Sequence, residues 1–161
     1  MIPSAAANLA DGQAESLAIS GSMVLPDLDI WLYAFSRHQS DPQVVAGFSA
    51  LVRQRRICSI APIRQGLLTR CRDLGQHARL NTILTAFGDL RLDPADHVRA
   101  AELAVSQREQ GISVPAWHAL LWSVCARRQL RIWSRDRRWA SFTAAGCPWL
   151  ADPGIGQVNL A

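Results

Sequence analysis

Short segments with the character of buried strands alternate along the chain with longer stretches in which apolar residues recur at helical spacing. The predicted strands lie at residues 24–25, 57–60, 89–92, 130–133 and 148–151. Between them, apolar side chains recur three and four positions apart, as they do on one face of an α-helix. Short buried strands that alternate with helices are typical of α/β domains with a parallel sheet. We therefore expect an α/β fold with a doubly wound, mainly parallel sheet of four to five short strands flanked by helices.

Local signals predict where several of the helices begin. Asp41 and Asp93 each precede a proline, and Asp accepts hydrogen bonds from a first helical turn in which Pro is tolerated. The helix after Asp93 has one apolar face, formed by Val98, Ala101 and Val105. Ser113 is expected to cap a later helix, whose apolar stripe consists of Trp117, Leu120, Leu121, Val124 and Cys125.

Length and composition limit the class of protein. The 161 residues suit one domain, which we place at residues 23–151, with a flexible lead at 1–22 and a loose tail at 152–161. Apolar residues make up 49% of the chain, an ordinary share for a globular protein. No apolar run approaches the roughly 18 residues of a membrane-spanning helix. The lead lacks the basic start and apolar stretch of a secretory signal.

All 17 basic residues are arginine, and against 13 acidic residues they give a formal charge of +4. The guanidinium group pairs with two phosphate oxygens at once, which suits nucleic-acid recognition. The same bias also follows from a GC-rich genome. The four cysteines contain no Cys-x-x-Cys pair, so we expect free thiols and a reducing cytoplasm.

Polar residues follow two of the predicted strands and begin two of the helices that feed neighbouring strands. Because ligands bind beyond the carboxyl ends of parallel strands, these residues are expected to converge at one edge of the sheet. They are Asp27, Asp29, Arg64, His118, Ser134, Arg135 and Asp136. Two carboxylates and one imidazole at such an edge form a set that can hold Mg²⁺ or Mn²⁺.

Four segments resemble, in the right order, the motifs of PIN domains, the ribonuclease fold of VapC-type toxins in toxin–antitoxin modules. They lie at residues 23–35, 62–70, 111–121 and 133–139, so the resemblance extends over nearly all of residues 23–150. It implies metal-assisted hydrolysis of RNA, in which clustered carboxylates bind Mg²⁺ or Mn²⁺ and the metal activates water. It also implies a protein antitoxin as partner and a homodimer.

The motifs depart from the PIN pattern at three positions. Asp27 and Asp136 match the first and fourth acids, but Gly66 stands where a Glu belongs and His118 where an Asp belongs. Arg138 replaces the second acid of the last motif. The resemblance implies Asp27 and Asp136 as catalytic residues and metal ligands. His118, which converges with them at the edge of the sheet, is the third candidate catalytic residue. The expected substrate contacts at this edge are Asp29, Arg64, Ser134 and Arg135.

Two functions fit this degenerate set of acids. One is a toxin-type endoribonuclease weakened by the loss of two site acids, and the other is a catalytically inactive PIN module that binds RNA, an antitoxin or its own copy. A DNA-processing nuclease on the same fold is a third, more distant reading. Each residue also has an ordinary structural role to fill. Asp27 and Asp136 suit helix N-caps, and His118 suits packing beside Trp117 or Trp122.

Overall fold

The computed structural model describes residues 22–36 and 40–150. The expected loose tail lies outside the described residues, as does the expected lead except for Ser22. The described strands form two small parallel sheets. Their bounds are β1 Val24–Pro26, β2 Ser59–Ile60, β3 Asp89–Leu90, β4 Arg131–Trp133 and β5 Trp149–Leu150.

The two sheets are joined into one surface by a parallel bridge between Val24 and Ile57. β1, β4 and β5 form one sheet in that order, and β2 pairs with β3 in the other. The chain thus adds strands on both sides of β1, and the direction of winding reverses between β1 and β4. This confirms the doubly wound parallel sheet, and it places the switch point between β1 and β4, where ligands bind in such folds.

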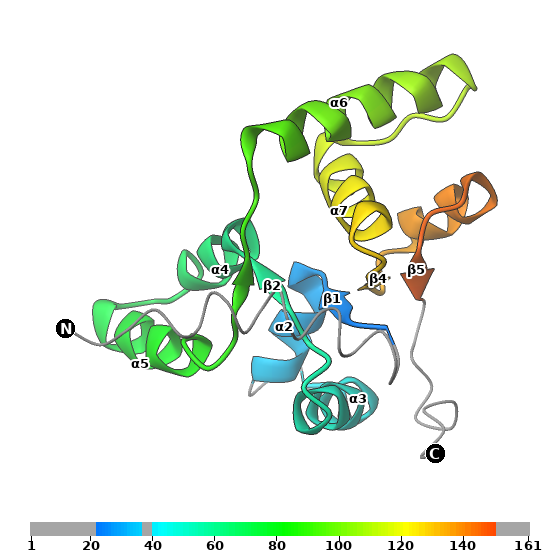
Figure 1. Ribbon diagram of the computed structural model, residues 1–161. Coiled ribbons are helices and arrows are strands. Elements are labelled where there is room, and N and C mark those ends of the chain that lie inside the picture. Colours follow the sequence, from blue (N-terminus) through cyan, green and yellow to red (C-terminus); the bar gives the residue numbers. More distant parts are fainter. Residues whose placement is uncertain (1–21, 37–39, 151–161) are drawn as a thin grey trace.

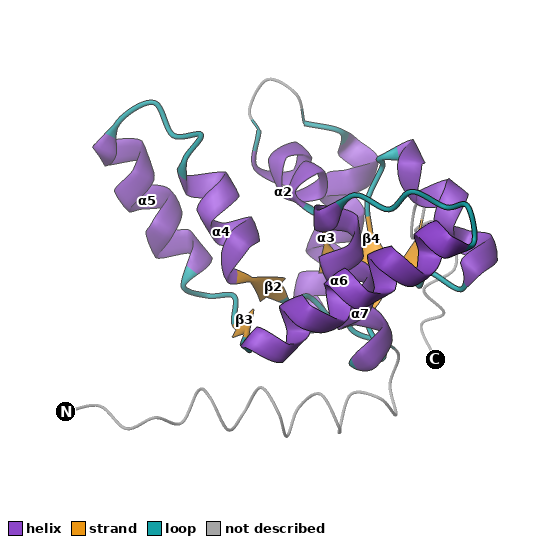
Figure 2. Cartoon of the chain, turned by 90° about the horizontal axis from the view of Figure 1, so that it is seen from above, coloured by secondary structure: helices purple, strands orange, loops and turns teal. Residues whose placement is uncertain are grey.

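Helices connect all the strands except β4 and β5, which a 3₁₀ helix joins. They are α2 Leu28–Phe35, α3 Pro42–Arg53, α4 Ala61–Leu68, α5 Leu74–Leu84, α6 Pro94–Glu109, α7 Ala116–Arg127 and the 3₁₀ helix η1 Arg137–Ala145. Both views show α4 and α5 together on the β2–β3 side of the molecule, with α6 lying across α7 (Figures 1 and 2).

The core lies around the central strands and is rich in tryptophan. Trp31, Trp133 and Trp139 are fully buried. Trp31 stacks edge-on against Phe48 and Phe87, and its indole nitrogen donates to the carbonyl of Pro26 at 3.1 Å. Because its N–H is hydrogen-bonded, the Trp31 ring can be buried in the core without leaving an unpaired donor there. These contacts fix α2 against the end of β1.

The cysteines behave as predicted for free thiols. All four are unpaired in the structure, and Cys58, Cys125 and Cys147 are buried. Burial raises the pKa of the Cys58 thiol to about 12, which keeps it protonated and unreactive at neutral pH.

The predicted helix starts at Asp41 and Asp93 are confirmed. The Asp93 carboxylate accepts from the backbone N–H of Asp96, and the Asp96 carboxylate accepts in return from the N–H of Asp93, a complete capping box. The predicted cap at Ser113 is wrong, because α7 begins after Pro115. Proline disfavours helical geometry in the residue before it, so a helix cannot run from Ser113 through Val114.

The apolar face predicted on α6 is not a core face. Val98 and Val105 are 57% and 50% exposed, and Ala101 is exposed as well. The helix packs on α7 through the next stripe around its axis, where Ala100 is buried. The buried Asp96 lies on the same side of α6, where it pairs with Arg127 at the end of α7 and with Arg128 just after it.

Asp96 is 1% exposed and anchors α6 to the end of α7. Its carboxylate accepts a hydrogen bond from Arg127 and lies 3.7 Å from a guanidinium nitrogen of Arg128. Burial opposes the charge, but the N–H of Asp93 and the two arginines outweigh it and lower the pKa of Asp96 below its ordinary value. This cluster is therefore ionised at neutral pH.

Replacing Asp96 with Asn is expected to lower the free energy of unfolding by about 2–3 kcal/mol, because two partly buried guanidinium groups lose their counter-ion. Urea denaturation at pH 7 followed by circular dichroism measures the loss. Glu102→Gln, an exposed change on the same helix, serves as the control and should stay within about 0.5 kcal/mol of wild type. Equal effects of the two changes would contradict a stabilising role for the cluster.

Candidate functional site

Asp27 lies at the switch point of the sheet and is 6% exposed. Its backbone N–H donates to the carbonyl of Trp133 at 2.8 Å, which continues the β1–β4 pairing by one residue. Its Oδ1 accepts from the N–H of Leu28 at 2.7 Å and from Nε1 of Trp117 at 3.0 Å. Asp27 is therefore the N-cap of α2, and through its hydrogen bond with Trp117 it also links α7 to the end of β1.

Asp29 holds the segment that follows β4. Its Oδ2 accepts from the Ser134 hydroxyl at 3.1 Å and from the backbone N–H of Arg135 at 2.8 Å, and its Oδ1 accepts from the N–H of Ile30. Burial raises the pKa of the Asp29 carboxyl above its ordinary value, and the hydrogen bond from Arg135 only partly opposes this. Each oxygen of Asp29 is thus occupied by donors of the chain itself.

Asp136 lies between the side chains of His118 and Arg138. Nε2 of His118 lies 3.2 Å from its Oδ2. The guanidinium group of Arg138 approaches the same oxygen through Nε at 2.9 Å and through a terminal nitrogen at 2.7 Å. The pKa of Asp136 is lowered to about 2, mainly by the hydrogen bond from the Arg138 side chain. The backbone N–H of Arg138 and the ring of His118 lower this pKa further. Asp136 is also the N-cap of η1.

His118 is both a packed and a hydrogen-bonded residue. It is 2% exposed, and its ring lies 4.5 Å from that of Trp139 and 5.8 Å from that of Phe142. Its Nδ1 is buried and has no hydrogen-bond partner among the described residues. Its other ring nitrogen, Nε2, is the one directed at Asp136.

Gly66 faces the same region from α4. A Cβ atom at this position would lie 3.0 Å from a methyl carbon of Leu28, the residue after Asp27. The position that carries a Glu in the resembled motif is therefore directed at the start of α2, and the side chain of Leu28 fills the space. A longer side chain at residue 66 requires Leu28 to move.

The other predicted contacts are drawn away from this cluster. Arg64 pairs with Asp89 at 2.6 Å and donates to the carbonyl of Phe87, beside the β2–β3 sheet. Arg135 pairs with Asp41 at 2.6 Å, and its guanidinium lies 5.7 Å from the centre of the Tyr33 ring. The structure therefore brings together Asp27, Asp29, His118, Ser134 and Asp136, and it directs the side chains of Arg64 and Arg135 elsewhere.

Two residues that shape this site were not among the predicted site residues. Trp117 donates to Asp27, and Arg138 neutralises Asp136. No local signal marked Arg138, because side chains two positions apart do not normally face each other on a helix. Trp117 sits on the apolar stripe of α7, and nothing in that pattern distinguishes a tryptophan with a polar contact from one that only packs.

The residues present do not fit a divalent metal ion. No group of three or more His, Cys, Asp or Glu side chains with metal-binding geometry occurs in the described part of the chain. Mg²⁺ and Mn²⁺ need several free carboxylate oxygens. Here Asp29 accepts from three donors, and Asp136 carries an arginine on the oxygen that also faces His118.

Comparison with known proteins gives matches among solved structures alone. No family model matches the sequence, and no curated protein matches it. The chain is similar to the structure of FitAcB from Neisseria gonorrhoeae, with a TM-score of 0.64 and 19% identity over 80% of this chain and 96% of that one. A structure of FitAB bound to an IR36 DNA fragment gives a TM-score of 0.67 and 18% identity over 80% and 94%.

A third similar structure is VapBC2 from Rickettsia felis bound to a DNA fragment from their promoter, with a TM-score of 0.59 and 11% identity over 74% and 91% of the two chains. These complexes are toxin–antitoxin systems whose toxin is a PIN domain. The fold is PIN-like. At such low identity the likeness extends to the fold alone. Within the described residues, no helix of the PIN-like fold is long and apolar enough to cross a membrane.

Arg138→Gln is expected to raise the pKa of Asp136 from about 2 toward its ordinary value of 3.8, because the guanidinium contact is its largest cause. A carboxyl with a lowered pKa stabilises the fold above its ordinary pKa, and this contribution is lost as the pH falls from about 4 to about 2. Carboxyl carbon NMR titration measures the shift. Arg137→Gln, an exposed neighbour, is the control and should leave Asp136 unchanged. An unmoved Asp136 in the Arg138 variant would refute the assignment.

Proposed function

We propose that this protein is a catalytically inactive PIN-like module of the toxin–antitoxin kind, which acts by binding a protein antitoxin and does not hydrolyse RNA. The observation that carries the proposal is the ion pair between Arg138 and Asp136, at 2.7 Å, in the centre where the resembled family holds its metal. That the similar structures are complexes of two different proteins supports a protein partner.

The electrostatics of the centre argue against hydrolysis. Metal-assisted cleavage needs a cluster of negative charge that gathers the cation and leaves room for water and phosphate. Of the four expected acids, two are absent at Gly66 and His118, and a third, Asp136, is neutralised by Arg138. Asp27 alone, buried and capping α2, cannot supply such a field.

The arginines argue for a protein partner over RNA. Binding to a nucleic-acid backbone draws its free energy from several cations that are free to meet phosphates. Arg64, Arg135 and Arg138 each form an ion pair with a carboxylate of this chain, at 2.6–2.7 Å. An RNA ligand would have to compete with Asp89, Asp41 and Asp136 for these groups.

A weakened metal-dependent endoribonuclease is the second candidate. It is favoured by one observation, the convergence of Asp27, Asp29, Asp136 and His118 at the switch point of the sheet. If Arg138 moved aside, Asp27 and Asp136 would be the ligands left for Mg²⁺ or Mn²⁺. The two candidates therefore differ in a measurable property, the affinity of this centre for the metal.

For the wild-type chain, titration calorimetry with Mn²⁺ and with Mg²⁺ to 5 mM is expected to give no saturable binding, and incubation with RNA no cleavage. The triple variant Gly66→Glu, His118→Asp, Arg138→Asp restores the acids of the resembled motifs. It is expected to bind Mn²⁺, because the three new carboxylates join those of Asp27 and Asp136 at one edge of the sheet. Expression of this variant should also slow bacterial growth.

The matched control is the same triple variant with Asp27→Asn, which should lose both Mn²⁺ binding and toxicity. Circular dichroism establishes that both variants are folded. Because Leu28 blocks the path of a residue-66 side chain, Leu28→Ala is added to each variant if the triple form binds weakly. Mn²⁺-dependent cleavage by the wild-type chain that disappears in Asp27→Asn would overturn the proposal in favour of the endoribonuclease.

A further inference from the structure

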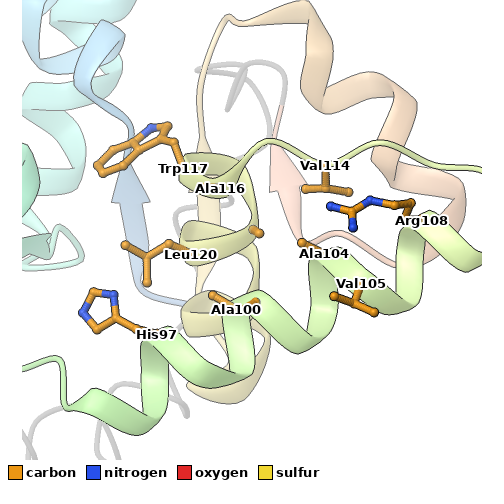
Figure 3. Close-up of a pocket in the computed structure, with 11 residues that line it drawn as sticks. His97, Ala100, Ala104, Val105, Arg108, Val114, Ala116, Trp117 and Leu120 are labelled. Carbon is orange, nitrogen blue, oxygen red and sulfur yellow. The ribbon is translucent and has the colours of Figure 1, made fainter.

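A groove of about 540 Å³ runs between α6 and α7. Ala100, Ala104 and Val105 form its α6 wall, and Trp117 and Leu120 form its α7 wall (Figure 3). Volumes of several hundred cubic ångströms are typical of sites that take a ligand or an inserted side chain. The alanines on α6 create this groove, because their short side chains fill little of the space between the helices.

The apolar surface of α6 continues beyond the groove. Val98 and Val105, at 57% and 50% exposure, flank the exposed Ala101 along one stripe of the helix. Isolated apolar residues on a surface are ordinary, but a stripe of them bordering an apolar groove is typical of a binding surface. Covering this stripe would be favourable by roughly 25 cal/mol for each square ångström removed from water.

The ionisable residues that line the groove indicate what kind of partner it binds. Of the residues that line it, the ionisable ones are His97 and Arg108, and both are basic. Neither forms an ion pair or a side-chain hydrogen bond within the described part of the chain. They lie eleven residues apart on one helix, which puts them on nearly the same face and about 16 Å apart. Figure 3 shows them toward opposite ends of the groove.

We propose that the groove between α6 and α7 binds an amphipathic helix of a partner protein, with an apolar stripe against Ala104 and Val105 and with carboxylates that meet His97 and Arg108. Two carboxylates eleven residues apart on the partner helix match this spacing. The inference rests on the proposed function, since it names the surface and the chemistry of the protein partner.

A second copy of this chain matches the groove less well. The exposed acids of α6 are Glu102 and Glu109, which are seven residues, or about 10 Å, apart. A second α6 laid along the groove would therefore meet one of the two basic residues and leave the other unpaired. The charges favour a different, acidic helix.

Trp117 connects the groove to the candidate site. Its ring lines the groove, and its indole nitrogen donates to Asp27. A helix seated in the groove removes this ring from water while leaving the hydrogen bond in place. Occupancy of the groove is therefore expected to change the fluorescence of Trp117, and Trp117→Phe removes the signal.

The test uses the full chain and two synthetic 18-residue helical peptides. Both carry a stripe of leucines, and one has two Glu eleven residues apart at its edge where the other has two Lys. The Glu peptide is expected to bind with a several-fold lower Kd than the Lys peptide in titration calorimetry at low salt, because the guanidinium group of Arg108 attracts a carboxylate and repels an ammonium group. Arg108→Glu should reduce or reverse this preference.

Val105→Asp is expected to weaken the Glu peptide at least tenfold, and Val45→Asp on α3 should leave its Kd unchanged. Both valines are partly exposed, so both variants should fold, as circular dichroism verifies. Equal binding of the two peptides, absence of binding, or equal effects of the two aspartates would overturn the proposal. A dimer in light scattering that Val105→Asp dissociates would also overturn it, because a second copy would then fill the groove. None of these readouts depends on metal or RNA, so they succeed or fail independently of the inactive-centre proposal.

Discussion

The register of β1 against β4 determines where every carboxylate of the candidate site can lie. Pro26 pairs with Trp133, so the next residues of the two strands, Asp27 and Ser134, emerge side by side at the switch point of the sheet. The N–H of Asp27 then bonds to the carbonyl of Trp133, and Asp29 bonds to Ser134. A shift of one residue in this pairing would turn each of these side chains to the other face of the sheet.

Helices and strands could be predicted from the sequence where the local start signals and the apolar pattern indicate the same element. The strands near Val24 and Ile132 are short and apolar, and the helices after Asp41 and Asp93 have strong start signals, so these elements could be predicted. The face of α6 could not. Its apolar stripe suggests one orientation, whereas the face that packs on α7 carries the buried Asp96, whose carboxylate pairs with Arg127 at the end of α7 and with Arg128 just after it.

In the candidate site, too, some positions could be predicted from the sequence and others could not. Chain connectivity was enough to bring Asp27, Asp136 and His118 to one edge of the sheet, since strand ends and helix starts meet there in any parallel α/β fold. Connectivity does not determine the direction in which a long side chain extends. Arg64 turns toward Asp89 and Arg135 toward Asp41, and Arg138 folds back on Asp136, each to the nearest carboxylate it can reach.

The three departures from the PIN motifs act together in this structure. The missing side chain at Gly66 leaves room for Leu28, which closes the α4 side of the centre. His118 packs its ring against Trp139 and turns one nitrogen to Asp136, whose remaining charge Arg138 balances. A centre with a net negative charge would be unstable without a cation, so the loss of acids and the gain of Arg138 support each other. The result is a centre whose carboxylates are paired within the chain itself, and through Trp117 it adjoins the groove that we assign to a protein partner.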